Sequence, residues 1–196
     1  MARAMVKHNF GKKIDAAGLY SSDLLQVALF RIDNAPLGTN TAVHAAYTLD
    51  AVATLKTTAI TSPTVARNLV VKGNQAGVAG NVVIAGTNMA GEAITETIIA
   101  ADAAVVVGNK AFKTVTSITF PALAGAGDTI SIGTGAKLGI PYKLTYASQI
   151  HNAIFNGSAE NLAAQTVSST VLESNTVTTT TALDGVKDLE LVILVK

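Results

Sequence analysis

Seven short runs of apolar or alternating residues between positions 63 and 146 restrict the fold more than any other feature of this chain. The segments between these runs are rich in Gly, Asn and Ala, and the runs read RNLVVKG, GNVVIAG, EAITETIIA, AVVVG, AFKTVTSITFP, DTISIG and KLGIPYKL. Short strands at close, even spacing with Gly and Asn turns are typical of β-sandwiches and barrels. We therefore predict an all-β protein, an antiparallel β-sandwich or barrel of short strands, with residues 63–146 as its core module.

Alternation within two of these runs indicates which side chains form the core. Side chains two residues apart on a strand point to the same face of the sheet. Phe112, Ile118 and Phe120 are therefore expected to share one face of their strand, and Ile130 and Ile132 to share one face of another. We expect all five side chains to be buried.

Residues 1–62 are predicted to form an extended N-terminal arm followed by a β-rich segment. Two apolar runs in this part read SSDLLQVALFRID and HAAYTLDAVATLKTTAI. Their periodicity is compatible with a short helix or with a buried strand, and periodicity alone does not separate the two for runs of this length. Thr and Val favour strands, so we predict that both runs are strands.

Residues 147–196 are predicted to complete the sheet. The segment SAENLAAQ indicates one or two helical turns, and the Thr-rich SSTVLESNTVTTTTALDG indicates a strand or an extended segment. The final run, DLELVILVK, alternates apolar and other residues and predicts a strong terminal strand, with Leu189, Leu191, Ile193 and Val195 on one face.

The low charge of the chain indicates a surface that contacts other proteins. Only 14% of the residues are charged although 49% are hydrophobic, whereas about 25% charged residues is usual. A free monomer usually carries more charge to stay soluble. There is no cysteine and no apolar run long enough for a signal peptide or a membrane span, so we expect the protein to be made in a cytoplasm.

The first 13 residues differ in charge from the rest. They hold four basic residues and no acidic one, a local charge of +4. Such a segment is either a solvated tail or an arm that docks on an acidic neighbour. Because surface ion pairs contribute only about 0–1 kcal/mol each, a docking arm also needs apolar contacts. The candidate interface residues of the arm are Arg3, Met5, Val6, Lys7, Phe10, Lys12 and Lys13.

Motifs that carry catalysis or bind metals or cofactors are not recognisable in the sequence. His8, His44 and His151 lie far apart, and none has a second ligand-type residue two to four positions away. The glycines of GTGAKLG (residues 133–139) do not have the spacing of a dinucleotide-binding loop. We therefore expect no enzyme activity, no catalytic residues, no cofactor and no metal. Outside the arm the chain is acidic, which argues against specific nucleic-acid binding.

Glu92 and Glu96 are the one pair of carboxylates whose spacing invites a catalytic interpretation. On a strand they lie on the same face about 13 Å apart, with Ile94 between them. The paired carboxylates of glycosidases are about 5–9.5 Å apart. We therefore predict that the pair lies on a solvated or interface-facing edge of a structural hairpin.

Two stretches of the core module resemble a known class of proteins. VARNLVVKGNQAGVAGNVVIAGTNMAGEAITETI and KAFKTVTSITFPALAGAGDTISIGTGAKLGIP resemble a segment that recurs in virion structural proteins of tailed bacteriophages. The resemblance covers residues 65–141 and rests on turn residues and core strands. It implies a β-sandwich that decorates or cements the capsid, or lies elsewhere in the particle.

The expected function is therefore that of a capsid decoration or cement protein that stabilises the phage head. The expected partners are the major capsid protein or other virion proteins and further copies of the chain, with no membrane. The expected location is the virion, after synthesis in the host cytoplasm. The alternatives are another virion component (neck, tail or baseplate) and, less favoured, a carbohydrate- or receptor-binding β module. Sugar sites usually stack aromatic rings on the ligand, and this chain has no Trp.

Overall fold

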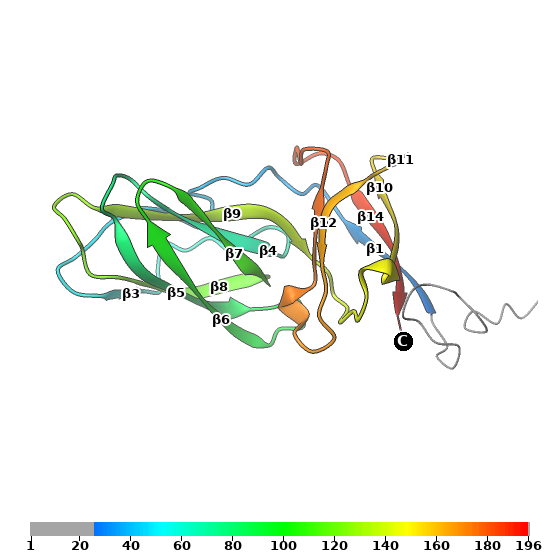
Figure 1. Ribbon diagram of the computed structural model, residues 1–196, viewed down its shortest axis with the longest axis horizontal. Helices are drawn as coiled ribbons and strands as arrows, with labels where there is room; N and C mark the ends of the chain where they lie inside the picture. The colour runs from blue at the N-terminus through cyan, green and yellow to red at the C-terminus, as the bar shows by residue number, and fades with distance from the viewer. Residues whose placement is uncertain (1–25, 196) are drawn as a thin grey trace, which may run out of the picture.

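The computed structural model describes residues 26–195 and confirms an all-β fold. Within that range the chain forms strands in three antiparallel sheets, and its helical content is limited to two single-turn 3-10 helices, η1 (Ala147–Gln149) and η2 (Leu172–Ser174). Figure 1 shows an elongated molecule in which two of the sheets overlap along one part of the long axis and the third lies toward the other end. The predicted architecture of short antiparallel strands is therefore correct.

The sheet at one end of the molecule contains four strands in the order β3-β8-β5-β6. Its strands are β3 (Thr54–Lys56), β8 (Thr114–Phe120), β5 (Ala79–Thr87) and β6 (Ala93–Ala101). β5 and β6 form a regular hairpin in which Ala79 pairs with Ala101 and Thr87 with Ala93. Burial in β6 alternates between one residue and the next, as expected for a sheet with one face on a core.

The central sheet is built around β9. Its strands run in the order β12-β13-β9-β4-β7, and β2 pairs with β9 beside this path. They are β12 (Leu162–Thr166), β13 (Thr176–Thr179), β9 (Thr129–Gly139), β4 (Arg67–Gly73), β7 (Val105–Phe112) and β2 (His44–Thr48). The two strands β2 and β13 pair with opposite ends of β9.

The sheet at the other end joins the beginning and the end of the described chain. Its order is β1-β14-β10-β11, with β1 (Gln26–Ile32), β14 (Leu189–Val195), β10 (Ile150–Phe155) and β11 (Ser158–Ala159). Gln26 pairs with Val195 and Ile32 with Leu189. The predicted terminal strand is confirmed, and Leu189, Leu191 and Ile193 are buried on one face.

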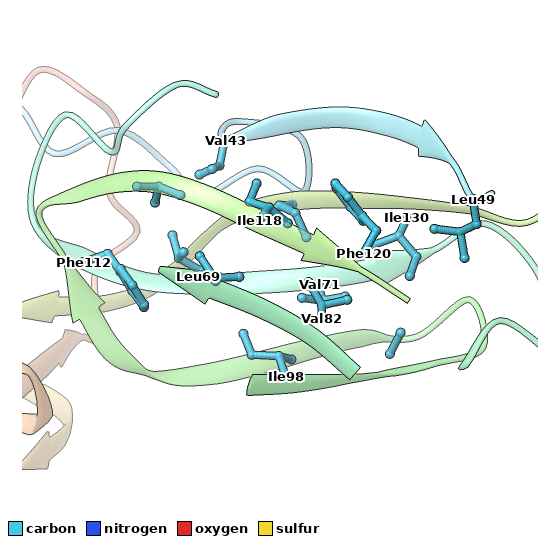
Figure 2. Close-up of a cluster of buried hydrophobic side chains, with 14 of the residues drawn as sticks. Val43, Leu49, Leu69, Val71, Val82, Ile98, Phe112, Ile118, Phe120 and Ile130 are labelled. Carbon is cyan, nitrogen blue, oxygen red and sulfur yellow. The ribbon is translucent and has the colours of Figure 1, made fainter. Parts of the chain in front are cut away.

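The first hydrophobic core lies between the β3-β8-β5-β6 sheet and the central sheet, as in a sandwich (Figure 2). Its larger members come from both sheets and from the loops beside β2: Val43, Leu49, Leu69, Val71, Val82, Ile84, Ile98, Phe112, Ile118, Phe120, Ile130 and Ile132. The five side chains that the sequence placed in the core are all among them, and all are fully buried.

A second hydrophobic core lies between the other end of the central sheet and the β1-β14-β10-β11 sheet. Its larger members are Ile32, Leu138, Ile140, Leu144, Ile150, Phe155, Val177, Leu183, Leu189, Leu191 and Ile193. β9 contributes Ile130 and Ile132 to the first core and Leu138 to the second. This strand therefore connects the two cores.

The predicted boundary between the fourth and fifth runs is wrong. β7 continues through Asn109 and Lys110 to Phe112, and the chain bends at Lys113 into β8. β7 pairs with β4 in the central sheet, whereas β8 pairs with β5 and β3 in the end sheet. Phe112 therefore belongs to a different strand from Ile118, although the two side chains share the first core.

The predicted turn at TGA, before a separate strand in KLGIPYKL, is also wrong, because residues 134–136 lie inside β9. The neighbouring glycines mark close approaches of other chain segments, a common reason for glycine within a strand. A Cβ on Gly133 would lie 1.9 Å from the carbonyl oxygen of Thr39, and one on Gly135 would lie 2.4 Å from the Oδ1 of Asn68. Residues 140–144 follow β9 without forming a strand.

The helical turns predicted for SAENLAAQ are replaced by strands β11 and β12. Asn156 and Gly157 take positive φ angles of 51° and 77° and form the turn that leads from β10 into β11. Glu160 accepts hydrogen bonds from the backbone N–H groups of Thr180 and Thr181 and from the Thr181 hydroxyl. Tertiary contacts override the local helix propensity of this segment.

The two apolar runs of the N-terminal zone are strands where the structure describes them. The first forms β1 from Gln26 onward. The second contains two separate strands, β2 and β3, which belong to different sheets. Asp50 lies in the loop between them and accepts hydrogen bonds from the hydroxyls of Tyr47 and Thr54. These bonds lower the pKa of the Asp50 carboxyl.

Replacing Phe120 by Ala tests the first core. The Phe120 ring is fully buried and lies 4.7 Å from the Tyr47 ring and 5.3 Å from the His44 ring, centroid to centroid. We expect Phe120→Ala to lower the free energy of unfolding by about 3–5 kcal/mol, measured by chemical denaturation. Leu55→Ala, on the exposed side of the neighbouring β3, should change it by less than about 0.5 kcal/mol. Equal effects of the two variants would contradict this core.

Candidate functional site

The predicted interface arm lies outside the residues that the structure describes, which begin at Gln26. Its role therefore stays a prediction. The arm residues are Arg3, Met5, Val6, Lys7, Phe10, Lys12 and Lys13.

Glu92 is exposed, as predicted, and belongs to the turn between β5 and β6. The buried side chain of Asn88 organises this turn. Its Oδ1 accepts hydrogen bonds from the N–H groups of Ala90 and Glu92, and its Nδ2 donates to the Glu92 carboxylate at 2.8 Å. Glu92 therefore has a structural contact within the hairpin.

The pair was predicted to lie on a solvated or interface-facing edge, and for Glu96 this is wrong, because its carboxylate is half-buried within the chain itself. Burial in β6 alternates so that Glu96 lies on the same face as the buried Ile94 and Ile98, and this face packs on the core. The Glu96 carboxylate accepts hydrogen bonds from the backbone N–H of Asn109 at 2.6 Å and of Lys110 at 3.3 Å. β6 and β7 belong to different sheets, so the carboxylate links the edges of two sheets.

Gly108 makes room for this carboxylate. A Cβ at position 108 would lie 2.7 Å from the Oε2 of Glu96 and 2.8 Å from the Cδ1 of Ile98. Both distances are shorter than ordinary Cβ contacts, so a larger residue would require the ends of the Glu96 and Ile98 side chains to shift. Gly108 in β7 and Glu96 in β6 therefore form one packing unit, which the sequence does not reveal because they belong to different predicted runs.

Burial raises the pKa of the Glu96 carboxyl. The hydrogen bonds from Asn109 and Lys110 and the charges of Lys110 and Lys137 oppose this shift. The net direction is upward because loss of hydration disfavours the charged form more than these contacts favour it.

Lys110 connects Glu96 to a second carboxylate on the far side of β7. Its Nζ lies 3.4 Å from the Oε1 of Glu173 in η2. Lys137 of β9 donates to the Oδ1 of Asn109 at 2.7 Å. We call these five residues, Glu96, Asn109, Lys110, Lys137 and Glu173, the β7 polar cluster. Its charged groups pair with each other or with backbone, an arrangement that cross-links β6, β7, β9 and η2.

The histidines of the described chain do not form a metal site. His44 is buried against Phe120, and its Nδ1 lies 2.7 Å from the carbonyl oxygen of Ala45. His151 is exposed on β10. Within residues 26–195, no three His, Cys, Asp or Glu side chains are grouped as metal ligands.

A buried arginine is the functional candidate that the sequence did not indicate. Arg67 begins β4 and is 1% exposed. Burial lowers the pKa of its guanidinium to about 10, so the group stays charged at neutral pH. The sequence signal was absent because an Arg at the start of an apolar run usually marks an exposed strand end.

The outer face of β1 carries exposed apolar side chains on a sheet edge. Val27 and Leu29 are 53% and 67% exposed. Directly paired residues lie on the same face of an antiparallel sheet, so Leu29 and its partner Val192 form a continuous apolar strip with Val27. Within the described chain, β1 pairs with β14 alone. An edge of this kind is a ready site for association with another chain.

Comparisons with known proteins give no relative for this chain. No family model matches it, and neither a curated protein nor a solved structure matches it. In the part of the chain from residue 26 to residue 195, no helix has the length and apolar character needed to cross a membrane.

Replacing Glu96 by Ala tests the link between the two sheets. The change leaves backbone N–H groups of β7 without their acceptor at a half-buried position, so we expect the free energy of unfolding to fall by about 1–3 kcal/mol. Thr97→Val, at an exposed position of the same strand, is the matched control, and its exposed position predicts a change within about 0.5 kcal/mol. Chemical denaturation of both variants measures the difference. Similar small changes in both would show that Glu96 is solvated after all.

Proposed function

We propose that this chain is a non-enzymatic virion structural protein of a tailed bacteriophage, and that it decorates or cements the head. The observation that carries the proposal is the outer face of β1, where Val27, Leu29 and Val192 form an apolar strip at a sheet edge that pairs with β14 alone among the described strands. The low proportion of charged residues and the resemblance of residues 65–141 to segments of such virion proteins also support it.

The fold suits a protein that works by contacting other proteins. Two hydrophobic cores share β9, and strands lie toward both ends of the elongated molecule (Figure 1). A cement protein works by adding buried area between neighbouring shell subunits. A stable interface needs roughly 1,200–2,000 Å² of buried surface, so the β1 strip requires additional contacts, for which the N-terminal arm is our candidate.

The proposed partners are the major capsid protein, or another virion protein, and further copies of the chain. Most soluble homo-oligomers have closed symmetry, and symmetry-related copies would fit a regular shell. The direct test is cryo-electron microscopy of the parent particle, with this chain located by its side-chain density. A position over the capsid lattice supports the proposal, whereas a ring at the portal vertex or along the tail assigns the chain to the neck, tail or baseplate.

Replacing Leu29 by Asp tests the β1 surface. Because Leu29 is 67% exposed, the variant should keep the wild-type melting temperature within about 2 °C, while its affinity for particles that lack the protein should fall at least about tenfold. Leu55→Asp, at a position 60% exposed on β3 at the other end of the molecule, is the matched control. If both variants bind particles as the wild type does, attachment does not use β1.

Deleting residues 1–13 tests the arm. Both described cores lie within residues 26–195, so the truncated protein should fold and stay soluble, and it should bind particles more weakly. Charge reversal at Lys12 and Lys13 should mainly slow association and reduce its dependence on salt, because rim charges steer encounter more than they hold a complex. Surface plasmon resonance on immobilised particles separates the two rates. Unchanged binding by the truncated protein would contradict the arm proposal. The β1 surface would then remain the candidate attachment site.

A further inference from the structure

The guanidinium of Arg67 lies at the contact between three chain segments. Its Nε donates to the carbonyl oxygen of Gly135 in β9 at 2.6 Å, and its Nη1 donates to the carbonyl oxygen of Pro36 at 2.6 Å. The third nitrogen, Nη2, is buried without a hydrogen-bond partner among the described residues. The side chain therefore holds the loop after β1 against β9, and its Nη2 group keeps its donors unused.

This cation lacks a carboxylate partner in the described chain. The ion pairs within residues 26–195 involve Arg31, Lys110 and Lys187, and none involves Arg67. Buried charges in proteins are normally paired and fully hydrogen-bonded, because loss of hydration is costly. Two backbone carbonyls compensate only part of that cost, so the site favours a negatively charged group.

A pocket of about 200 Å³ lies beside Arg67. Its wall is formed by apolar residues from the segment between β1 and β2 and the segment between β3 and β4, together with hydroxyl-bearing residues. The lining residues are Pro36, Leu37, Thr39, Ala42, Thr61, Ser62, Pro63, Thr64, Arg67 and Thr134. A mainly apolar wall with one charged residue in the lining is the usual form of a site that takes a small organic ion.

We propose that this pocket binds a short aliphatic carboxylate, with the carboxylate group on Arg67 and the alkyl chain against Pro36, Leu37 and Pro63. Guanidinium and carboxylate match in planarity and can form two parallel hydrogen bonds. Because Nη2 is shielded from solvent, the loop at Pro36 shifts when the ligand enters. The inference concerns a different part of the molecule from the β1 surface and does not depend on a role in the virion.

The same wall disfavours phosphate. A phosphate group carries more charge and accepts several hydrogen bonds, and phosphate sites usually supply clustered N–H donors or several basic residues. Arg67 is the single basic residue in the lining of this pocket. The carboxylate could belong to a free small molecule or to a Glu or Asp side chain of another protein, and both sources present the same group.

The test uses the full-length protein, labelled with ¹⁵N, and a pair of ligands that differ in charge but hardly in shape. Propionate should shift the backbone amide resonances of Leu37, Arg67 and Gly135 in a saturable way. Propionamide should bind at least about tenfold more weakly, since it lacks the charge that strengthens a hydrogen bond to Arg67. Equal binding of the two, or no saturable shift with propionate, would overturn the proposal. Tighter binding of inorganic phosphate would overturn the carboxylate assignment.

Variants then locate the binding. Arg67 is structural as well, and its replacement can impair folding, so the blocking variant is Ala42→Phe, at an exposed position in the pocket wall. It should abolish the propionate shifts. Ala46→Phe, on the exposed side of the nearby β2, should leave them unchanged. Propionate binding that survives Ala42→Phe would place the ligand elsewhere and refute this site.

A third ligand separates the two sources of the carboxylate. A glutamate residue capped at both ends carries the same alkyl carboxylate as propionate, with backbone groups that must remain outside the pocket. Binding as tight as that of propionate supports an acidic side chain from a partner as the occupant. Binding of propionate without binding of capped glutamate supports a free small carboxylate. If neither capped glutamate nor propionate binds, both sources of the carboxylate are refuted.

Discussion

The structure depends on a single strand that serves two hydrophobic cores. β9 supplies Ile130 and Ile132 to one core and Leu138 to the other, and it pairs with β4 along much of its length. A strand of 11 residues is long for a protein built from short strands, and it keeps its course because Gly133 and Gly135 admit the backbone of residues 39–40 and the side chain of Asn68. A larger residue at either glycine would separate β9 from its neighbours.

Buried polar side chains fix how the strands meet around β9. The amide of Asn68 is fully buried, donating to the carbonyl oxygen of Gly108 and accepting from the N–H of Lys137. Arg67, the residue before Asn68, donates hydrogen bonds to the carbonyl oxygens of Gly135 and Pro36. Apolar contacts tolerate a shift of one strand along another, whereas these hydrogen bonds are satisfied in one register only. The pair at the start of β4 therefore sets the alignment of β4, β7 and β9.

The local sequence pattern was enough to find most strands. It failed where contacts between distant segments determine the backbone conformation or the burial of a side chain. The runs at β5, β6 and β14 matched the structure because burial there alternates at the period of a strand, and the run at β4 matched as a short continuous apolar segment. Glycine in β9 was interpreted as a turn, although it marks the approach of a distant loop. Glu96 and Arg67 were misjudged or missed because their partners lie on other strands, and a single sequence does not show which strands become neighbours.

The pairing of β1 with β14 has a mechanical consequence. Gln26 lies directly opposite Val195, so a pull between these two positions acts along the hydrogen bonds, which run perpendicular to antiparallel strands. The ladder would then unzip one residue pair at a time. The ladder between β1 and β14 is therefore weak against a force that separates Gln26 from Val195, the first and last residues described.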